Sequence, residues 1–125
     1  EQIGVVYCDI TGLKKVNDEQ GHEAGDRLII RACECLAGVF KGYGLYRIGG
    51  DEFLVLCLGI EEKDLREHVE KLRMDMKEHQ VTMAVGMIWK ERGPKDIDLL
   101  LNESERLMYE DKDRYYKEHG LKRRR

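Results

Sequence analysis

The sequence predicts an α+β domain in which helices pack on the faces of one antiparallel-containing β-sheet. Apolar runs of strand length occur at residues 3–8, 45–48, 53–58 and 81–89, and segments with helical periodicity separate or follow them. The resulting order is strand, two helices, hairpin, helix, strand, helix, which a single sheet with helices on its faces accommodates. A chain of 125 residues is long enough for one core, so we expect a single domain over residues 1–125.

The first part of the chain predicts a buried strand and two helices. Residues 3–8 form an apolar run that ends at Asp9. Residues 11–18 predict a short helix, with Gly21 just beyond it as a stop. Residues 23–40 predict a helix of about four to five turns. Its apolar residues recur at helical spacing: Leu28, Ile29, Ala32, Cys33, Leu36, Val39 and Phe40.

The hairpin is centred on a pair of adjacent glycines. Gly49 and Gly50 lie between two apolar runs, and we expect them to supply the positive φ that a tight turn requires. Such a turn would place Asp51 and Glu52 at its tip, where a cation or a substrate can approach the backbone. The alternative is a hairpin whose polar tip is only solvated.

The last part of the chain predicts a helix, a strand and a final long helix. The first of these helices is amphipathic, with an apolar stripe at Leu65, Val69, Leu72 and Met76. Residues 81–89 predict a strand, and Gly93 with Pro94 predicts a turn. The final helix is expected to begin near Ile97 and to end at Gly120.

Composition excludes several classes of function. The net charge of −3 gives no sign of a nucleic-acid partner, and the basic run at residues 122–125 is interpreted as a solvated chain end. No apolar stretch reaches the length of a membrane span, and the first residues do not resemble a signal peptide. The four cysteines form no Cys-x-x-Cys pair, so we expect buried free thiols in a reducing cytoplasm. Because the chain does not begin with methionine, we expect a fragment of a longer protein.

Two aspartates suggest a metal site. Asp9 follows the first strand and Asp51 lies at the tip of the hairpin, so both carboxylates reach the same sheet edge if these strands pair. Carboxylate oxygens suit Mg²⁺, which takes the rest of its ligands from water and substrate phosphates. Two such ions would clamp the attacking and leaving oxygens of a phosphoryl displacement. The alternative is that Asp9 only caps the helix that follows it.

The segment after Asp9 suggests a nucleotide site. The free backbone N–H groups near Gly12 and Leu13 lie at a predicted helix N-terminus, where they could cradle a triphosphate. Asn17 and Asp26 flank the turn between two predicted helices, and an amide and a carboxylate together can bind the Watson–Crick edge of guanine. The alternative for Asn17 is a helix C-terminal residue, and for Asp26 a surface charge.

The chain resembles the GGDEF family, the diguanylate cyclases that join two GTP molecules into cyclic di-GMP. Residues 9–26 read Asp-Ile-Thr-Gly-Leu-Lys-Lys-Val-Asn-Asp-Glu-Gln-Gly-His-Glu-Ala-Gly-Asp, and residues 47–53 read Arg-Ile-Gly-Gly-Asp-Glu-Phe. Both parts are similar to the motif of that family at its spacing, and the resemblance covers most of residues 3–112. It implies a ferredoxin-like fold related to the palm-type domains of adenylyl cyclases and polymerases.

The resemblance also implies a role for individual residues. The metal ligands would be the side chains of Asp9 and Asp51 with the Ile10 carbonyl, and Glu52 would lie near the reacting 3′-hydroxyl or the metals. Asp9, Asp51 and Glu52 would form the catalytic set. The residues that would bind GTP are Gly12, Leu13, Lys14, Asn17, Asp26, Gly50 and Lys112.

The family further implies cofactors, partners and a location. We expect two Mg²⁺ ions per GTP, with Mn²⁺ as a substitute, and pyrophosphate as the second product. Turnover would require a homodimer with one GTP in each protomer. A fused sensory or regulatory domain is expected in the full-length protein, with this domain in the cytoplasm even where the whole protein is anchored in a membrane.

The sequence departs from the family in two places that bear on function. Tyr116 occupies a position where some members have a phosphate-binding arginine, and Arg114 or Lys117 are the nearest cationic substitutes. Residues 40–43, Phe-Lys-Gly-Tyr, occupy the position of the Arg-x-x-Asp inhibitory site, so we expect that product-binding site to be absent. The alternative to an active cyclase is an inactive GGDEF domain that acts as a GTP sensor or an interaction module.

Overall fold

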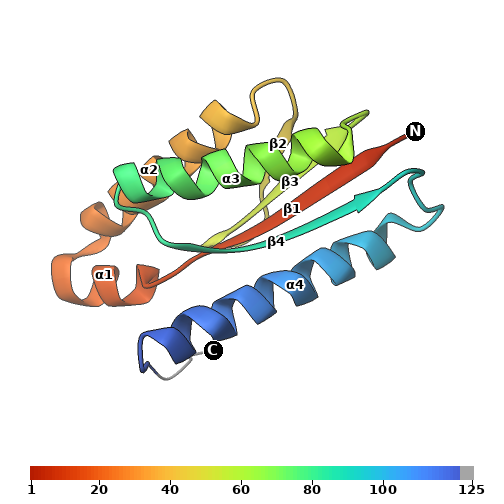
Figure 1. Cartoon of the computed structure of the whole chain (residues 1–125). Coiled ribbons are helices and arrows are strands. Elements are labelled where there is room, and N and C mark those ends of the chain that lie inside the picture. The colour runs from red at the N-terminus through yellow and green to blue at the C-terminus, as the bar shows by residue number, and fades with distance from the viewer. Residues whose placement is uncertain (122–125) are drawn as a thin grey trace.

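The computed structural model describes residues 1–121 and contains one four-stranded antiparallel sheet with helices on both faces (Figure 1). The basic run at residues 122–125, expected to be a solvated end, lies outside the described residues. In chain order the elements are β1 (Ile3–Ile10), α1 (Leu13–Gln20), α2 (His22–Val39), β2 (Gly44–Arg47), β3 (Glu52–Leu58), α3 (Glu62–Glu78), β4 (Met83–Lys90) and α4 (Ile97–Glu118). This order confirms the predicted one.

The strands lie in the order β2-β3-β1-β4, so the first strand is central and hydrogen-bonds to both β3 and β4. Helices α2 and α3 cover one face of the sheet and α4 covers the other, while α1 lies beyond the end of β1 (Figure 1). Among residues 1–121, no helix combines the length and apolar character that crossing a membrane requires.

The core follows the alternation of side chains along β1. Val6, Cys8 and Ile10 pack in the larger cluster with α2 and α3, and Val5 and Tyr7 pack in the smaller cluster with α4. All four cysteines are free thiols, and three are buried while Cys33 is half-buried, largely as the sequence predicted. The alternation places the odd-numbered residues of β1, Asp9 among them, on the α4 side of the sheet.

The turn between β1 and α1 begins later than the sequence predicted. The strand continues to Ile10 because Asp9 and Ile10 still pair with β4, and the helix begins only at Leu13. Gly12 makes this junction with φ of 81°, a left-handed conformation that glycine adopts without a steric cost. The Thr11 N–H donates to the Thr82 carbonyl at 2.8 Å, which ties the junction to the residue before β4.

The expected role of the glycine pair in the hairpin is wrong. Neither Gly49 nor Gly50 has a positive φ. The connection is longer than a two-residue turn, and the Arg47 guanidinium stabilises it by donating to the Gly49 carbonyl at 3.2 Å and the Gly50 carbonyl at 2.7 Å. Since the reversal is spread over several residues, the left-handed conformations of a two-residue hairpin are not needed.

Helix α4 lies unusually close to β4 at Gly86. A Cβ atom at this position would lie 2.3 Å from both the Met108 nitrogen and the Ser104 carbonyl oxygen. Only a glycine therefore allows this helix backbone to rest directly on the strand. The contact sets the height of α4 above the sheet, and so the position of the α4 side chains that reach the end of β1.

Candidate functional site

The acidic residues predicted from the sequence meet where β1 ends and β3 begins. Asp9 pairs with Glu52 across the two strands, and the Ile10 N–H donates to the Asp51 carbonyl at 2.8 Å. The condition on which the metal hypothesis depended, pairing of the first strand with the hairpin, is thus met. Asp51 and Glu52 are half-buried, and Asp9 is only 4% exposed.

Asp9 is a buried carboxylate that forms an ion pair with Lys112. Its Oδ2 accepts a hydrogen bond from Lys112 Nζ at 2.9 Å, and this ion pair is almost completely removed from solvent. Its Oδ1 is buried without a hydrogen-bond partner among residues 1–121. Burial raises the pKa of Asp9 from 3.8 to about 6, with the negative charge of Asp51 acting in the same direction and Lys112 opposing both.

A second layer of polar groups lies behind this pair. The Tyr7 hydroxyl lies 3.1 Å from Glu105 Oε2 and 3.4 Å from Glu52 Oε2. Burial raises the pKa of Glu52, and the negative charges of Asp51 and Glu105 raise it further, while the hydrogen bond from Tyr7 and the charge of Lys112 lower it. Burial also raises the pKa of Tyr7, as do the hydrogen bond with Glu105 and the charge of Glu52.

Tyr7 and Glu105 were not predicted as site residues, although both carry a local signal in the sequence. Tyr7 precedes Asp9 by two positions, so the two side chains lie on the same face of β1. Glu105 precedes Lys112 by seven positions, which is about two helical turns, so both lie on one side of α4. Either signal becomes useful only once it is known that α4 packs against β1.

The residues expected to bind phosphates lie at the N-terminus of α1. Gly12 is the N-cap residue, and no side chain caps the first N–H groups of the helix. Leu13 is half-buried and Lys14 is exposed. Only Thr11 and Gly12 separate this end of α1 from Ile10, so its backbone donors follow the end of β1 that carries Asp9.

The residues expected to bind guanine lie at the contact between α1 and α2. Asn17 packs over Gly25, since a Cβ atom on Gly25 would lie only 1.7 Å from Asn17 Oδ1. Asp26, the next residue, is exposed. Asn17 is five residues beyond Gly12, which is about 7–8 Å farther along the axis of α1.

Gly50 differs from the other glycines of the site. It is exposed, its φ is not positive, and a Cβ atom would find nothing within 4 Å. The structure of the chain alone therefore places no demand for glycine at this position. Gly49, by contrast, leaves room for Glu52, whose Oε1 would lie 3.0 Å from a Cβ atom on Gly49.

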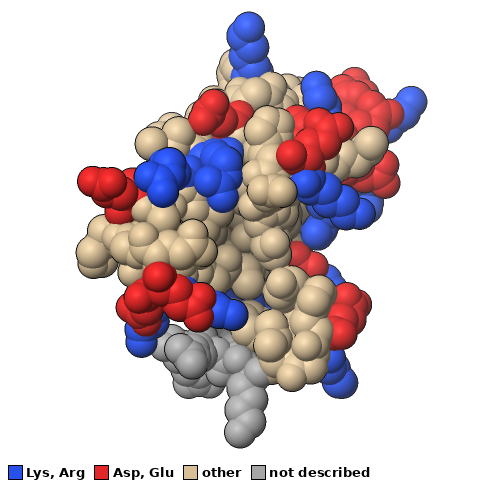
Figure 2. All heavy atoms as spheres, turned by 90° about the vertical axis from the view of Figure 1, so that its left-hand side faces the viewer, with Lys and Arg blue, Asp and Glu red and all other residues tan. Residues whose placement is uncertain are grey.

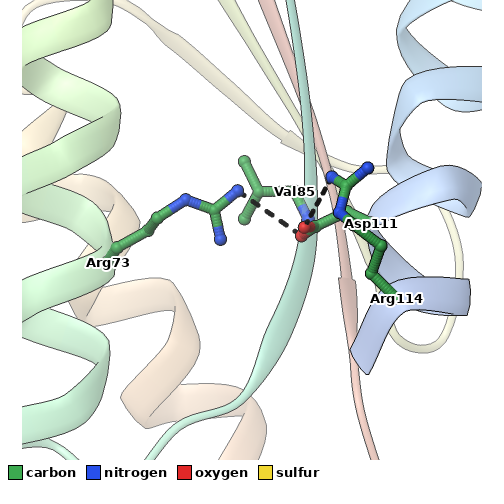
Figure 3. A network of polar contacts seen from close by, with 4 residues as sticks. All are labelled: Arg73, Val85, Asp111 and Arg114. Atoms are coloured by element: carbon green, nitrogen blue, oxygen red, sulfur yellow. Dashed lines mark hydrogen bonds and ion pairs between the residues drawn. The ribbon is translucent and has the colours of Figure 1, made fainter. Parts of the chain in front are cut away.

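Arg114, one of the two cationic residues near Tyr116, is paired with Asp111 of its own helix. Its guanidinium donates to Asp111 Oδ1 at 3.1 Å, in a network beside β4 that also contains Arg73 and Val85 (Figure 3). Residues two positions apart on a helix are about 200° apart around its axis, so Arg114 and Lys112 point in different directions. Lys117 is exposed.

Figure 2 shows the end of the molecule that carries α1. Groups of acidic and basic side chains lie near one another on this face. A hollow of about 430 Å³ lies between α3, β4 and α4 and is lined by Asp111 and Arg114, but by none of the predicted site residues. The candidate site is therefore defined by the carboxylates, Lys112 and the α1 N-terminus.

Comparison with known proteins identifies the family of this chain. Residues 1–117 match the family described as "Diguanylate cyclase, GGDEF domain". The bifunctional diguanylate cyclase/cyclic di-GMP phosphodiesterase MucR of Pseudomonas aeruginosa is 30% identical over 122 residues, which cover 90% of this chain and 18% of MucR. Diguanylate cyclase DgcP of Escherichia coli is 27% identical over 121 residues, which cover 89% of this chain and 36% of DgcP.

The fold is also that of solved relatives. The active GGEEF domain of a diguanylate cyclase from Vibrio cholerae is similar with a TM-score of 0.82 at 22% identity, over 91% of this chain and 78% of that one. This similarity confirms the predicted α+β fold. The chain spans well under half the length of either MucR or DgcP. Because the family match extends over nearly the whole sequence, the chain belongs to the diguanylate cyclase GGDEF domain family.

Proposed function

We propose that this chain is the catalytic domain of a diguanylate cyclase, which condenses two GTP molecules into cyclic di-GMP and two pyrophosphates. The observation that carries the proposal is the meeting of Asp9 and Asp51 at one sheet edge, beside Lys112 and the N-terminus of α1. Family membership supports the reaction type. The roles of the individual residues are part of the proposal.

The donor set fits Mg²⁺. Asp9 Oδ1 is a buried acceptor without a hydrogen-bond partner in the described part of the chain, and such an atom is costly unless a cation or a donor compensates it. Asp9, Asp51 and the Ile10 carbonyl would hold the ion, and all three supply oxygen ligands. When bound, Mg²⁺ or Mn²⁺ would polarise the α-phosphate and lower the pKa of the 3′-hydroxyl.

The chain's own groups would bind and orient GTP. The N–H groups near Gly12 and Leu13 would hold phosphate oxygens, because the N-terminus of α1 is free of a side-chain cap. Lys112 would contact the terminal phosphates, exchanging part of its interaction with Asp9 for them, and Lys14 would lie nearby. Asn17 and Asp26 would bind guanine, and Gly50 would leave room for the nucleotide beside the hairpin.

Glu52 would act at the reacting hydroxyl. It is half-buried, lies opposite Asp9 across the two strands and has a raised pKa, so it can accept a proton more readily than an exposed carboxylate. Each protomer would bind one GTP, and each 3′-hydroxyl would attack the α-phosphate held by the partner. Because the two half-reactions are identical, a two-fold symmetric homodimer is the natural arrangement.

The proposal is tested by measuring the products that an enforced dimer of this chain forms from GTP. The chain is fused to a parallel dimeric coiled coil, incubated with GTP and Mg²⁺, and its products are separated by chromatography. We expect cyclic di-GMP and pyrophosphate from the wild type, none from Asp51→Ala, and an unchanged yield from Glu67→Ala, which removes an exposed carboxylate of α3. A dimer that binds GTP but forms no cyclic di-GMP would overturn the proposed activity.

A further inference from the structure

The Tyr7 hydroxyl links three elements that meet behind the acidic edge. It contacts Glu52 on β3 and Glu105 on α4, and the tyrosine itself lies on β1 with only 7% of its surface exposed. The ring packs among apolar side chains of the smaller core, which holds the hydroxyl oxygen in a defined place. We refer to Tyr7, Glu52 and Glu105 as the tyrosine cluster.

The tyrosine cluster contains one hydroxyl donor and two carboxylates that can accept its hydrogen bond. A phenol has one proton to donate, whereas an ionised carboxylate only accepts. Glu52 and Glu105 therefore compete for a single donor. The distance to Glu105 is 3.1 Å and that to Glu52 is 3.4 Å, so Glu105 has the better share of the Tyr7 proton in this structure.

Glu52 is held from two sides. One carboxylate oxygen, Oε2, faces the Tyr7 hydroxyl, and the other, Oε1, lies over the backbone at Gly49, where a Cβ atom would be only 3.0 Å away. Gly49 thus gives the side chain room to fold back, and Tyr7 offers it a hydrogen bond. Together they define where the carboxylate lies relative to Asp9, its partner across the strands.

We propose that Tyr7 is a positioning residue for the cyclase reaction, because its hydroxyl holds the Glu52 carboxylate in the place from which Glu52 acts, while Glu105 competes for the same hydroxyl. The inference rests on the proposed function. Tyr7 itself does not contact GTP in this scheme. A purely structural tyrosine would need only its ring, so the hydroxyl is the group to remove.

Two substitutions separate the two contacts of one hydroxyl. Tyr7→Phe keeps the ring and deletes both hydrogen bonds. Glu105→Gln removes the competing charge, and its amide can donate to the Tyr7 oxygen, which leaves the Tyr7 proton for Glu52. We expect Tyr7→Phe to lower kcat by about tenfold with KM for GTP within about twofold, and Glu105→Gln to keep or raise kcat. Tyr46→Phe, on exposed β2, is the matched control and should change neither.

A double-mutant cycle tests whether Tyr7 acts through Glu52. The residual rate of Glu52→Gln should be the same with and without Tyr7→Phe, because the positioned group is then absent. Independent and additive losses would overturn the inference, as would an unchanged kcat in Tyr7→Phe.

A spectroscopic readout does not depend on turnover. The ¹³C resonance of the Glu52 side-chain carboxyl should shift in Tyr7→Phe and move in the opposite direction in Glu105→Gln, while Tyr46→Phe leaves it in place. No shift in either variant would overturn the contact itself. If the variants show these shifts but the wild type makes no cyclic di-GMP, the proposed function is overturned and the contact stands, so the two failures are distinguishable.

Discussion

Lys112 Nζ lies 2.9 Å from Asp9 Oδ2, so a helix near the end of the chain and the first strand meet in an ion pair across 103 positions of sequence. Both side chains are largely buried. A buried pair of this kind is seldom a gain in stability over apolar packing, because desolvation offsets much of the attraction. The pair lies beside Asp51, in the site for which we propose the cyclase reaction, and that proposed role gives a reason for burying the two charges.

The first prediction concerns the pH dependence of stability. Because the pKa of Asp9 is raised from 3.8 to about 6 in the folded state, the folded protein binds this proton more tightly than the unfolded chain. The raised pKa of Asp9 contributes on the order of 3 kcal/mol to the free energy of unfolding. This contribution is fully present below about pH 4 and is lost as the pH rises through about 6. Asp9→Asn should remove this decline, as measured by urea unfolding between pH 4 and pH 8.

Substitution of the other member of the pair, Lys112, should have the opposite effect on stability at high pH. Lys112→Met leaves an ionised Asp9 without its partner at pH 8, where we expect a loss of about 3 kcal/mol, and a smaller loss at pH 5, where Asp9 is mostly protonated. Lys117→Met, on an exposed part of α4, is the control. Equal losses for Lys112→Met at the two pH values would contradict the assignment of the pair.

The contact between Gly86 and α4 predicts a large effect of one methyl group. Gly86→Ala places a Cβ atom against the helix backbone and should destabilise the fold by about 2–4 kcal/mol, since neither backbone can yield easily. The displaced helix carries Lys112, so GTP affinity should fall as well. The measurement is thermal unfolding with and without GTP.

The control for Gly86 lies on another helix. Gly38 on α2 is exposed and has nothing within 4 Å of a Cβ atom, so Gly38→Ala should stabilise the protein by about 0.5–1 kcal/mol. If Gly86→Ala and Gly38→Ala changed the free energy of unfolding in the same direction, the close approach of α4 to β4 would be refuted.

Asp111 protects the outer edge of β4. Its Oδ2 accepts the Val85 N–H at 2.8 Å, and Arg73 and Arg114 hold the carboxylate from two helices (Figure 3). Asp111→Ala should speed hydrogen exchange of the Val85 amide by about tenfold, because the N–H loses its acceptor. Asp111→Asn retains an acceptor oxygen, so its exchange rate measured by NMR should stay near that of the wild type. Equal exchange rates in the two variants would contradict the hydrogen bond between the Val85 N–H and Asp111.

Asp26 tests the proposed guanine site without a risk to the fold, since the side chain is exposed. Asp26→Asn should weaken GTP binding by about tenfold, because an amide is a poorer partner than a carboxylate for the N1 and N2 hydrogens of guanine. Binding of tripolyphosphate, which has no base, should be unchanged in calorimetry. The control is Glu23→Gln on the same helix. An equal loss of affinity for GTP and for tripolyphosphate in Asp26→Asn would contradict the assignment of Asp26 to the guanine base.

Much of the fold and part of the site followed from the sequence. The alternation in β1 and the helical spacing in α2, α3 and α4 depend on neighbouring residues, so local pattern was enough to predict the elements and their order. Asp9 and Asp51 could be placed at one edge because strands of a small sheet tend to pair. The hairpin shows the limit of this reasoning, since hydrogen bonds from Arg47 replaced the positive φ expected of Gly49 and Gly50.

The sequence by itself therefore determined the elements, the family and the candidate carboxylates, because each depends on short-range spacing. Tertiary structure alone decided that Lys112 pairs with Asp9, that Glu105 shares the Tyr7 hydroxyl with Glu52, and that Asp111 caps β4. These contacts join residues far apart in the chain. They depend on how closely α4 packs on the sheet, and that distance is set by the missing side chain of Gly86.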